Sequence, residues 1–311
     1  MDGSIPMLSE QALCLFSKQD KQLTRMTKKY RFYDRYFQEN NMNIKTGLCF
    51  VILLAGMMGC STKKTANSEL ASIEAYAKAE VIIERLRKQT EPDWNAIKAQ
   101  YEITSAIVKK YDAKLDMQYD EQIREALVKC TAGEKVKVNQ QTLAKGLQHV
   151  TVLAIRDELD DADKAVSVKR IKAYYKGIEP TFIRRDKDFF GESKTLQTAA
   201  HAALEHLIKA GSADYLAARR QIEDVIARTY GLCVLFEITD IEKLRNTDLA
   251  KCEVKKMEAV IFYRIIAPRI EKRSPKTAET ISNMLNGNYA TMDSAALEKN
   301  LKTGLAPVSL R

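Results

Sequence analysis

The chain has 311 residues, of which 45% are apolar and 29% charged, a globular balance that excludes a largely disordered protein. It has only 12 glycines and 6 prolines, which favours long helices over many short strands joined by turns. The formal charge is +9, but acidic and basic residues are interspersed without a basic block, so we expect no nucleic-acid partner.

Residues 1–41 form a polar segment that contains an aromatic-rich stretch from Lys28 to Phe37. A secretion signal begins a precursor, yet the apolar run that follows lies behind Met42. We therefore expect translation to start at Met42. Residues 1–41 are then a wrongly assigned gene start, and the alternative is that they are translated as a disordered extension.

The most distinctive feature is an uncharged apolar run of 14 residues from Gly47 to Cys60. As a helix it would span roughly 21 Å, whereas the hydrocarbon of a bilayer is about 30 Å thick. This length suits a signal-peptide core, although a short uncleaved membrane anchor or a buried core segment are the alternatives. Met42–Lys45 supply a short, positively charged start, and we expect the polar Ser61–Thr65 to be unstructured.

The run ends in Met57-Met58-Gly59-Cys60, which resembles the lipobox of bacterial lipoprotein precursors. The glycine and cysteine match the motif, while the two methionines replace its usual leucine and small residue.

This resemblance implies cleavage before Cys60 and lipidation of its thiol, with 42–59 as the signal peptide and 60–65 as a tether. A diacylglyceryl group and an amide-linked chain attach a protein stably, since each buried methylene contributes about 0.8 kcal/mol. Ser61 is not acidic, so no inner-membrane retention signal is evident. The resemblance therefore implies an outer-membrane lipoprotein that faces the periplasm.

From about residue 66 the apolar spacing is helical, which predicts an all-α, multi-helix bundle over 66–276. We expect a C-terminal helical tail over 277–311, with short helices near Ala278–Leu285 and Ser294–Leu301. Asp93 stands at an N-cap position. After Asp93, mostly apolar residues follow at intervals of three or four positions and form a stripe on one face of a helix: Trp94, Ile97, Tyr101, Thr104, Val108 and Tyr111.

The bundle also appears in two related halves. The Asp93 stripe recurs 121 residues later from Asp214, whereas Tyr174–Pro180 is echoed 88 residues later by Phe262–Pro268. The difference, 121 − 88 = 33, predicts an insertion in the first copy at about 113–145, including a short helix.

We therefore expect an internal duplication with halves of about 66–190 and 195–276, the alternative being a coincidence of two amphipathic helices. Pro180 and Pro268 would each break or kink a helix.

The cysteine spacing excludes zinc-finger and c-type haem motifs. Behind Cys60 three thiols remain, at Cys130, Cys233 and Cys252. A Cys233–Cys252 disulfide and buried free thiols are both compatible with the sequence.

Several side chains are candidate metal or ligand contacts. His201 and Glu205 are four residues apart and could share a helix face, as metal-binding pairs do, or could be ordinary surface residues. Glu102 and Glu223 occupy matched positions in the two halves, where they either line a groove or form ion pairs with nearby lysines. His149 is a further candidate. The acidic cluster Asp157–Asp163 could attract cations but lacks EF-hand spacing.

Glu179 precedes Pro180 in the segment Ala173–Pro180, which is followed by Arg185-Asp186. This segment resembles part of the extracytoplasmic helical domain of some bacterial iron-permease-type proteins. The resemblance covers about fifteen residues, and the R-E-x-x-E iron motif is absent. It implies binding of iron, another divalent metal or haem, but not transport.

No G-x-S-x-G, HExxH, P-loop or dinucleotide motif occurs, and we expect no enzyme and no cofactor. The sequence predicts a membrane-tethered lipoprotein with a non-enzymatic binding or scaffold domain and a protein partner in the cell envelope. The alternative is a metal- or haem-binding domain involved in iron handling. An enzyme would instead bring the following residues into one polar cleft: Glu102, His149, Glu179, His201 and Glu223.

Overall fold

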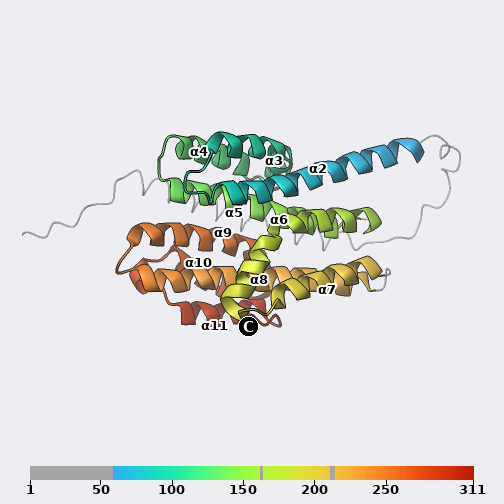
Figure 1. Ribbon diagram of the computed structural model, residues 1–311. Helices are drawn as coiled ribbons and strands as arrows, with labels where there is room; N and C mark the ends of the chain where they lie inside the picture. Colours follow the sequence, from blue (N-terminus) through green and yellow to red (C-terminus); the bar gives the residue numbers. More distant parts are fainter. Residues whose placement is uncertain (1–58, 162–163, 211–213) are drawn as a thin grey trace, which may run out of the picture. The chain divides into compact units, whose positions relative to one another are not determined.

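The computed structural model describes residues 59–161, 164–210 and 214–311. These residues are 84% helical, with ten α-helices and no strand, so the predicted all-α multi-helix bundle is confirmed. Figure 1 shows the elements, which are α2 (Gly59–Leu86), α3 (Trp94–Leu115), α4 (Tyr119–Thr131), α5 (Val136–Leu159), α6 (Lys164–Phe190), α7 (Thr195–Lys209), α8 (Tyr215–Leu244), α9 (Leu249–Arg273), α10 (Pro275–Asn286), the 3-10 helix η1 (Tyr289–Thr291) and α11 (Ser294–Leu305).

The predictions for residues 1–41 and for the apolar run up to Met58 lie outside the described residues. The prediction that Ser61–Thr65 are unstructured is wrong, because α2 begins at Gly59 and its backbone is helical through these positions. No glycine or proline stands between Cys60 and Leu86 to interrupt the helix. Among the described helices, none combines the length and apolarity that a membrane span requires.

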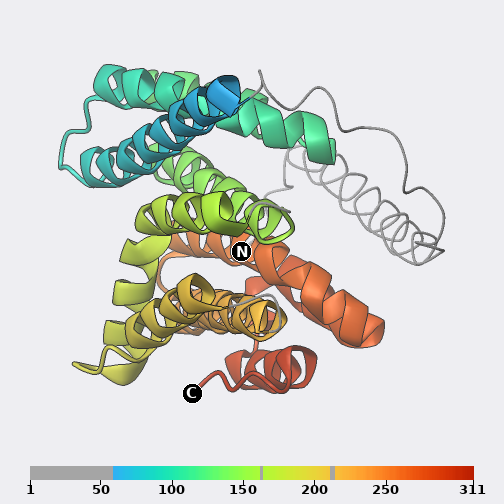
Figure 2. The ribbon, with the colours of Figure 1, turned by 90° about the vertical axis from the view of Figure 1, so that its right-hand side faces the viewer.

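Helix α6 joins two groups of helices. In the first group α2 packs on α3, α3 on α4 and α4 on α5, and in the second α7 packs on α8, α8 on α9 and α9 on α10. Helix α6 contacts α2 and α5 on one side and α7 and α8 on the other, and α5 also packs on α9. Figures 1 and 2 accordingly show α2 and α11 on opposite sides of the bundle, with α6 between them.

Aspartates cap three of the helices. The Oδ1 atoms of Asp93, Asp248 and Asp293 accept hydrogen bonds of 2.9, 3.0 and 2.9 Å from backbone amides three residues further on. Such caps satisfy amides that have no partner within the helix. Behind Asp93, the predicted stripe is buried from Ile97 to Tyr111, whereas Trp94 is half-buried.

Neither Pro180 nor Pro268 ends its helix. Both lie inside continuous helices, α6 and α9, which run on to Phe190 and Arg273. Of the two predicted outcomes, a helix break is therefore wrong, while a kink stays a prediction. Proline removes one amide donor and crowds the preceding turn. Both helices have packed neighbours on several sides, and these contacts hold the backbone helical despite the missing bond.

The internal duplication stays a prediction. Helix α4 lies where the insertion was expected to contain a short helix, but the supposed equivalents pack differently. Helices α8 and α9 lie along each other, whereas α3 packs on α2, α4 and α5, and α6 on other neighbours. Asp93 caps α3 with its side chain, while Asp214 makes no such bond to α8.

The two helices expected in the C-terminal tail are present as α10 and α11. Leu297, Leu301 and Leu305 of α11 are fully buried, and α11 packs on α8, α9 and α10. Residues 277–311 therefore belong to the same hydrophobic core as the preceding helices.

Candidate functional site

Only two of the candidate ligands come together. His201 Nε2 on α7 lies 3.0 Å from Glu179 Oε1 on α6. Gln197 Nε2 donates to the same carboxylate oxygen at 3.3 Å. The His201 ring also meets Tyr175 edge-on, with 5.8 Å between the ring centroids. The pair lies at the α6–α7 contact, with the His201 side chain largely exposed.

The predicted His201–Glu205 pair is not formed. Glu205 Oε1 instead lies 4.0 Å from Lys172 Nζ on α6. Within the described ranges, no three or more histidine, cysteine, aspartate or glutamate side chains gather closely enough to hold a metal ion.

Glu102 and Glu223 have separate partners on different helices. The Glu102 carboxylate accepts bonds of 2.6 and 3.0 Å from Arg124 on α4. Glu223 accepts from Arg156 on α5 at 3.1 Å. Both form ion pairs, as one interpretation of the sequence held, but with arginines of other helices rather than with nearby lysines.

His149 is a core residue. It is 1% exposed, and its Nδ1 lies 2.6 Å from the Tyr119 hydroxyl. Burial, followed by the nearby charges of Arg264 and Arg156, lowers the pKa of His149 to about 3. The imidazole is therefore neutral at physiological pH and has a packing role beside Tyr119.

The structure reveals a buried ionic cluster that the sequence reasoning missed. It joins α5, α8 and α9 through Lys145, Glu237, Lys255 and Glu258, which we call the central cluster. Lys145 Nζ lies 3.5 Å from Glu258 Oε1, and both side chains are over 90% buried. Lys255 Nζ donates to Glu237 Oε2 at 2.8 Å and lies 3.9 Å from Glu258 Oε2.

The two carboxyl groups of the central cluster have opposite pKa shifts. Burial and then the Glu258 charge raise the pKa of Glu237. Burial also opposes ionisation of Glu258, but the charges of Lys145 and Lys255 together hold its pKa below the ordinary value. Glu258 is therefore the ionised member that neutralises Lys145, and Glu237 is the carboxyl that more readily keeps a proton.

Arg185 of α6 extends the cluster toward Phe236. Its Nη1 lies 3.7 Å from Glu237 Oε1, and its Cζ stands 4.0 Å from the centroid of the Phe236 ring. Lys255 Nζ lies 5.2 Å from the same centroid. Two cations thus contact one aromatic ring, an arrangement that partly compensates for their burial.

A second buried polar centre lies between α2, α5 and α6. Glu80 Oε2 accepts a 2.8 Å hydrogen bond from Thr151 Oγ1, and the Tyr76 hydroxyl donates to the Leu147 carbonyl at 3.1 Å. Burial raises the pKa of Glu80 to about 8, against the lowering effect of the Thr151 bond. Glu80 Oε1 and Gln148 Oε1 have no hydrogen-bond partner among the described residues. Both residues line a cavity of about 10 Å³, the size of one water molecule.

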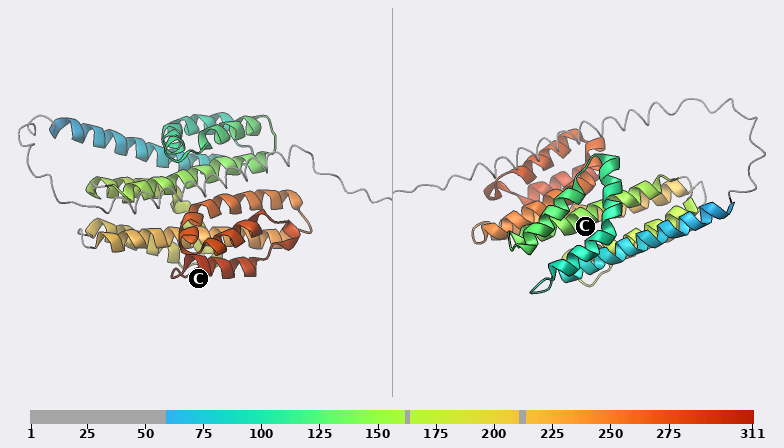
Figure 3. Two further views of the ribbon diagram at one scale, coloured as in Figure 1. Left: turned by 180° about the vertical axis from the view of Figure 1, so that it is seen from behind. Right: turned by 90° about the horizontal axis from the view of Figure 1, so that it is seen from above.

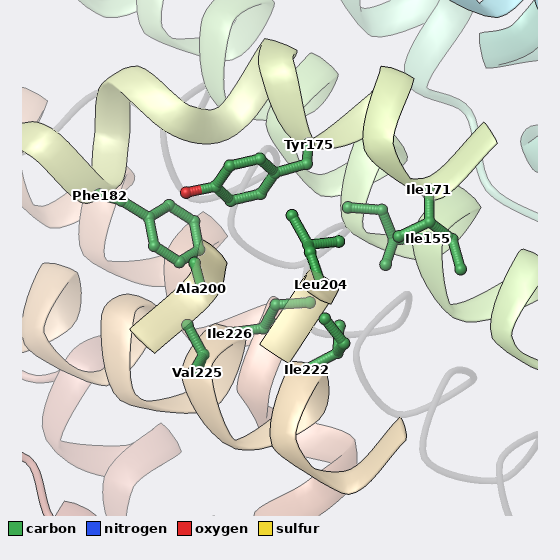
Figure 4. Close-up of a pocket in the computed structure, with 9 residues that line it drawn as sticks. All are labelled: Ile155, Ile171, Tyr175, Phe182, Ala200, Leu204, Ile222, Val225 and Ile226. Carbon is green, nitrogen blue, oxygen red and sulfur yellow. The ribbon is translucent and has the colours of Figure 1, made fainter. Parts of the chain in front are cut away.

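Figure 4 shows a third feature, an apolar pocket between α5, α6, α7 and α8. Its volume is about 20 Å³, too small for an organic ligand. The Tyr175 hydroxyl is the polar atom at this pocket, and it has no hydrogen-bond partner among the described side chains.

Cys130, Cys233 and Cys252 are free and buried. Of the two interpretations open from the sequence, the structure has buried thiols rather than a Cys233–Cys252 disulfide. Burial raises the pKa of Cys233 to about 11, so its thiol stays protonated and unreactive.

Comparison with known proteins identifies no relative: no protein family, no curated protein and no solved structure matches this chain.

Proposed function

We propose that this chain is a membrane-tethered bacterial lipoprotein, attached through Cys60, whose helical body is a non-enzymatic binding or scaffold module in the periplasm. The observation that carries the proposal is the apolar run from Gly47 that ends in Gly59-Cys60 and is followed at once by polar residues. Its length and its abrupt end are those of a cleaved lipoprotein signal.

The fold is compatible with cleavage before Cys60. That cut would remove one residue, Gly59, from α2. The buried side chains described in α2 begin at Ile73, so the hydrophobic core would be left whole.

The positions of the candidate ligands support a binding or scaffold role rather than catalysis. Glu102 and Glu223 are held in separate ion pairs, and His149 is a neutral core residue. The alternative of a metal- or haem-binding domain has the Glu179–His201 pair alone in its favour.

The test uses the full chain expressed in a bacterium that processes lipoproteins and fed a clickable fatty acid. We expect the protein to carry the label and to fractionate with membranes. Cys60→Ala should lose both properties. Cys49→Ala is the matched control, because Cys49 lies in the same apolar run but not at the cleavage site, and it should keep both. A Cys60→Ala protein that is still labelled and membrane-bound would refute the proposal.

Metal content is measured on the same purified protein. Stoichiometric iron, zinc or copper that is lost in Glu179→Gln would favour the metal-binding alternative.

A further inference from the structure

The first part of α2 and the termini of several other helices lie at one end of the bundle. Glu69 of α2 pairs with Lys110, near the end of α3, and with Arg170, near the start of α6. The Tyr215 hydroxyl, at the start of α8, donates to the carbonyl of Leu159, the last residue of α5. We call this the near end.

The last turn of α7 lies there too. Helix α7 runs antiparallel to α6, since His201 meets Glu179 while the later Glu205 meets the earlier Lys172. In Figures 1 and 3 the blue start of α2 lies at the same end of the bundle as the start of α6.

No flexible linker separates Cys60 from the near end. Both Cys60 and Glu69 belong to the one continuous helix α2. Nine residues of helix rise roughly 14 Å, so a lipid on Cys60 would hold the near end within about that distance of the membrane.

Resting on the proposed lipidation of Cys60, we propose that the near end is the membrane-facing surface of the body and lies against the lipid head groups. Two large apolar side chains are exposed there: Ile208, in the last turn of α7, is 42% exposed, and Leu216, in the first turn of α8, is 59% exposed. Apolar side chains at such a position gain free energy by entering the interfacial layer of a bilayer.

Each carboxylate that lines the near end has a basic partner, which reduces its repulsion from the lipid phosphates. Asp157 pairs with Lys114, Glu158 with Arg170 and Asp160 with Arg219. The open cleft beside these pairs has a volume of about 300 Å³. It is lined by five acidic and two basic side chains, which are Glu69, Asp157, Glu158, Asp160, Asp161, Lys110 and Arg170. A surface of mixed sign suits zwitterionic head groups and avoids the repulsion that unpaired carboxylates would meet at a phosphate layer.

The opposite end of the bundle offers a matched reference position. Helix α9 runs parallel to α5, because Lys135 pairs with Glu253 and Arg156 donates to the Ile265 carbonyl. The start of α9 therefore lies at the same end as the start of α5, opposite the near end, and we call this the far end. Leu249, the first residue of α9, lies there and is 61% exposed. The 24 residues of α5 separate the two ends by roughly 36 Å.

The experiment places one environment-sensitive fluorophore on Leu216→Cys or on Leu249→Cys in the lipidated full chain. Cys130, Cys233 and Cys252 are buried, and the thiol of Cys60 carries the proposed lipid, so these cysteines should not react. The protein is bound to phosphatidylcholine–phosphatidylethanolamine vesicles that carry a head-group quencher. We expect quenching at position 216 to exceed that at position 249 by at least threefold. A six-residue Gly-Ser insertion after Thr65 should reduce this contrast, because it uncouples the body from the anchor.

Lipidation is first confirmed by intact mass, and vesicle binding by flotation. A protein without lipid would contradict the proposed function itself. A lipidated, vesicle-bound protein with equal quenching at both positions, or more at 249, would overturn only the orientation. Circular dichroism of both variants checks that the bundle is intact.

Discussion

The Glu80 carboxylate lies directly against the backbone of Gly177, where α2 packs on α6. A Cβ atom built on Gly177 would stand less than 3.0 Å from Glu80 Oε2, closer than real Cβ atoms come to a neighbour. The same oxygen accepts the hydrogen bond from Thr151 of α5. Three helices therefore meet at one buried carboxyl group, and glycine is the residue that leaves room for it.

Gly177→Ala should destabilise the protein by about 1–2 kcal/mol. Displacing the buried Glu80 carboxyl and breaking its Thr151 bond together cost about 2–3 kcal/mol, which outweighs the gain of roughly 1 kcal/mol for alanine over glycine in a helix. Equilibrium urea unfolding measures the difference.

The same substitution in a Glu80→Ala background is the control, because the clash is then absent. There Gly177→Ala should be neutral or stabilising by up to about 1 kcal/mol. An equal loss of stability in both backgrounds would show that the Glu80 contact is not the cause.

Glu80→Gln should stabilise the protein increasingly as the pH rises from 5 to 8. Since burial raises the pKa of Glu80 from 4.5 to about 8, the folded state keeps its proton over a range in which the unfolded state has lost it. The contribution of Glu80 is thus fully present below about pH 4.5. Between about pH 4.5 and 8 it is lost at about 1.4 kcal/mol per pH unit, and the loss is complete once the pH has passed through the folded pKa of about 8. Unfolding free energies of both proteins at pH 5, 6, 7 and 8 give this difference directly.

Glu102→Gln is the matched control for this pH series. Glu102 is exposed, and its hydrogen bond to Arg124 lowers its pKa, so its titration lies below this pH range. A stability difference between wild type and Glu80→Gln that does not change from pH 5 to 8 would contradict the prediction.

Lys145→Met should destabilise the protein by about 3 kcal/mol, because it leaves the buried Glu258 without its nearest cation. Combining it with Glu258→Leu should restore much of that loss. We expect the double variant to be more stable than the sum of the two single effects by about 2 kcal/mol. Additive single effects in a denaturant double-mutant cycle would show that the two side chains are not coupled.

Cys233 and Cys252 should react with a thiol reagent only after unfolding. Both side chains are fully buried, and burial raises their thiol pKa values. We expect negligible reaction in native buffer over an hour and complete reaction in denaturant without a reductant. If the two thiols appear in denaturant only after reduction, a disulfide is present instead.

The sequence predicted the fold well where the helical spacing of apolar residues began directly after a helix-capping residue. The stripe behind Asp93 predicted the buried face of α3, and the sparse glycine and proline predicted an all-helical chain. The helix break considered at Pro180 does not occur, because the tertiary contacts of α6 outweigh one missing hydrogen bond. The prediction of an unstructured Ser61–Thr65 is wrong because polar residues do not by themselves indicate irregular structure. The segment contains no glycine or proline that would end a helix.

The interior polar centres could not be predicted from spacing alone. Lys145, Glu80 and Glu258 look like ordinary solvated charges in a sequence, and only packing reveals that they are buried. One signal was available: each stands close to core residues on its helix, as Glu258 does before Ile261 and Phe262. The partners lie up to 113 residues apart, as in Lys145–Glu258, and no local pattern links them.

The central position of α6 has a consequence for how the protein unfolds. Gly177 on this helix meets the first group of helices, while Phe182 and Arg185 meet the second. If either group unfolded, α6 would lose the packing contacts on one of its two sides. The bundle should therefore melt as a single cooperative unit, with secondary structure and the near-ultraviolet signal of the buried tyrosines disappearing together, even though its helices are arranged in two groups.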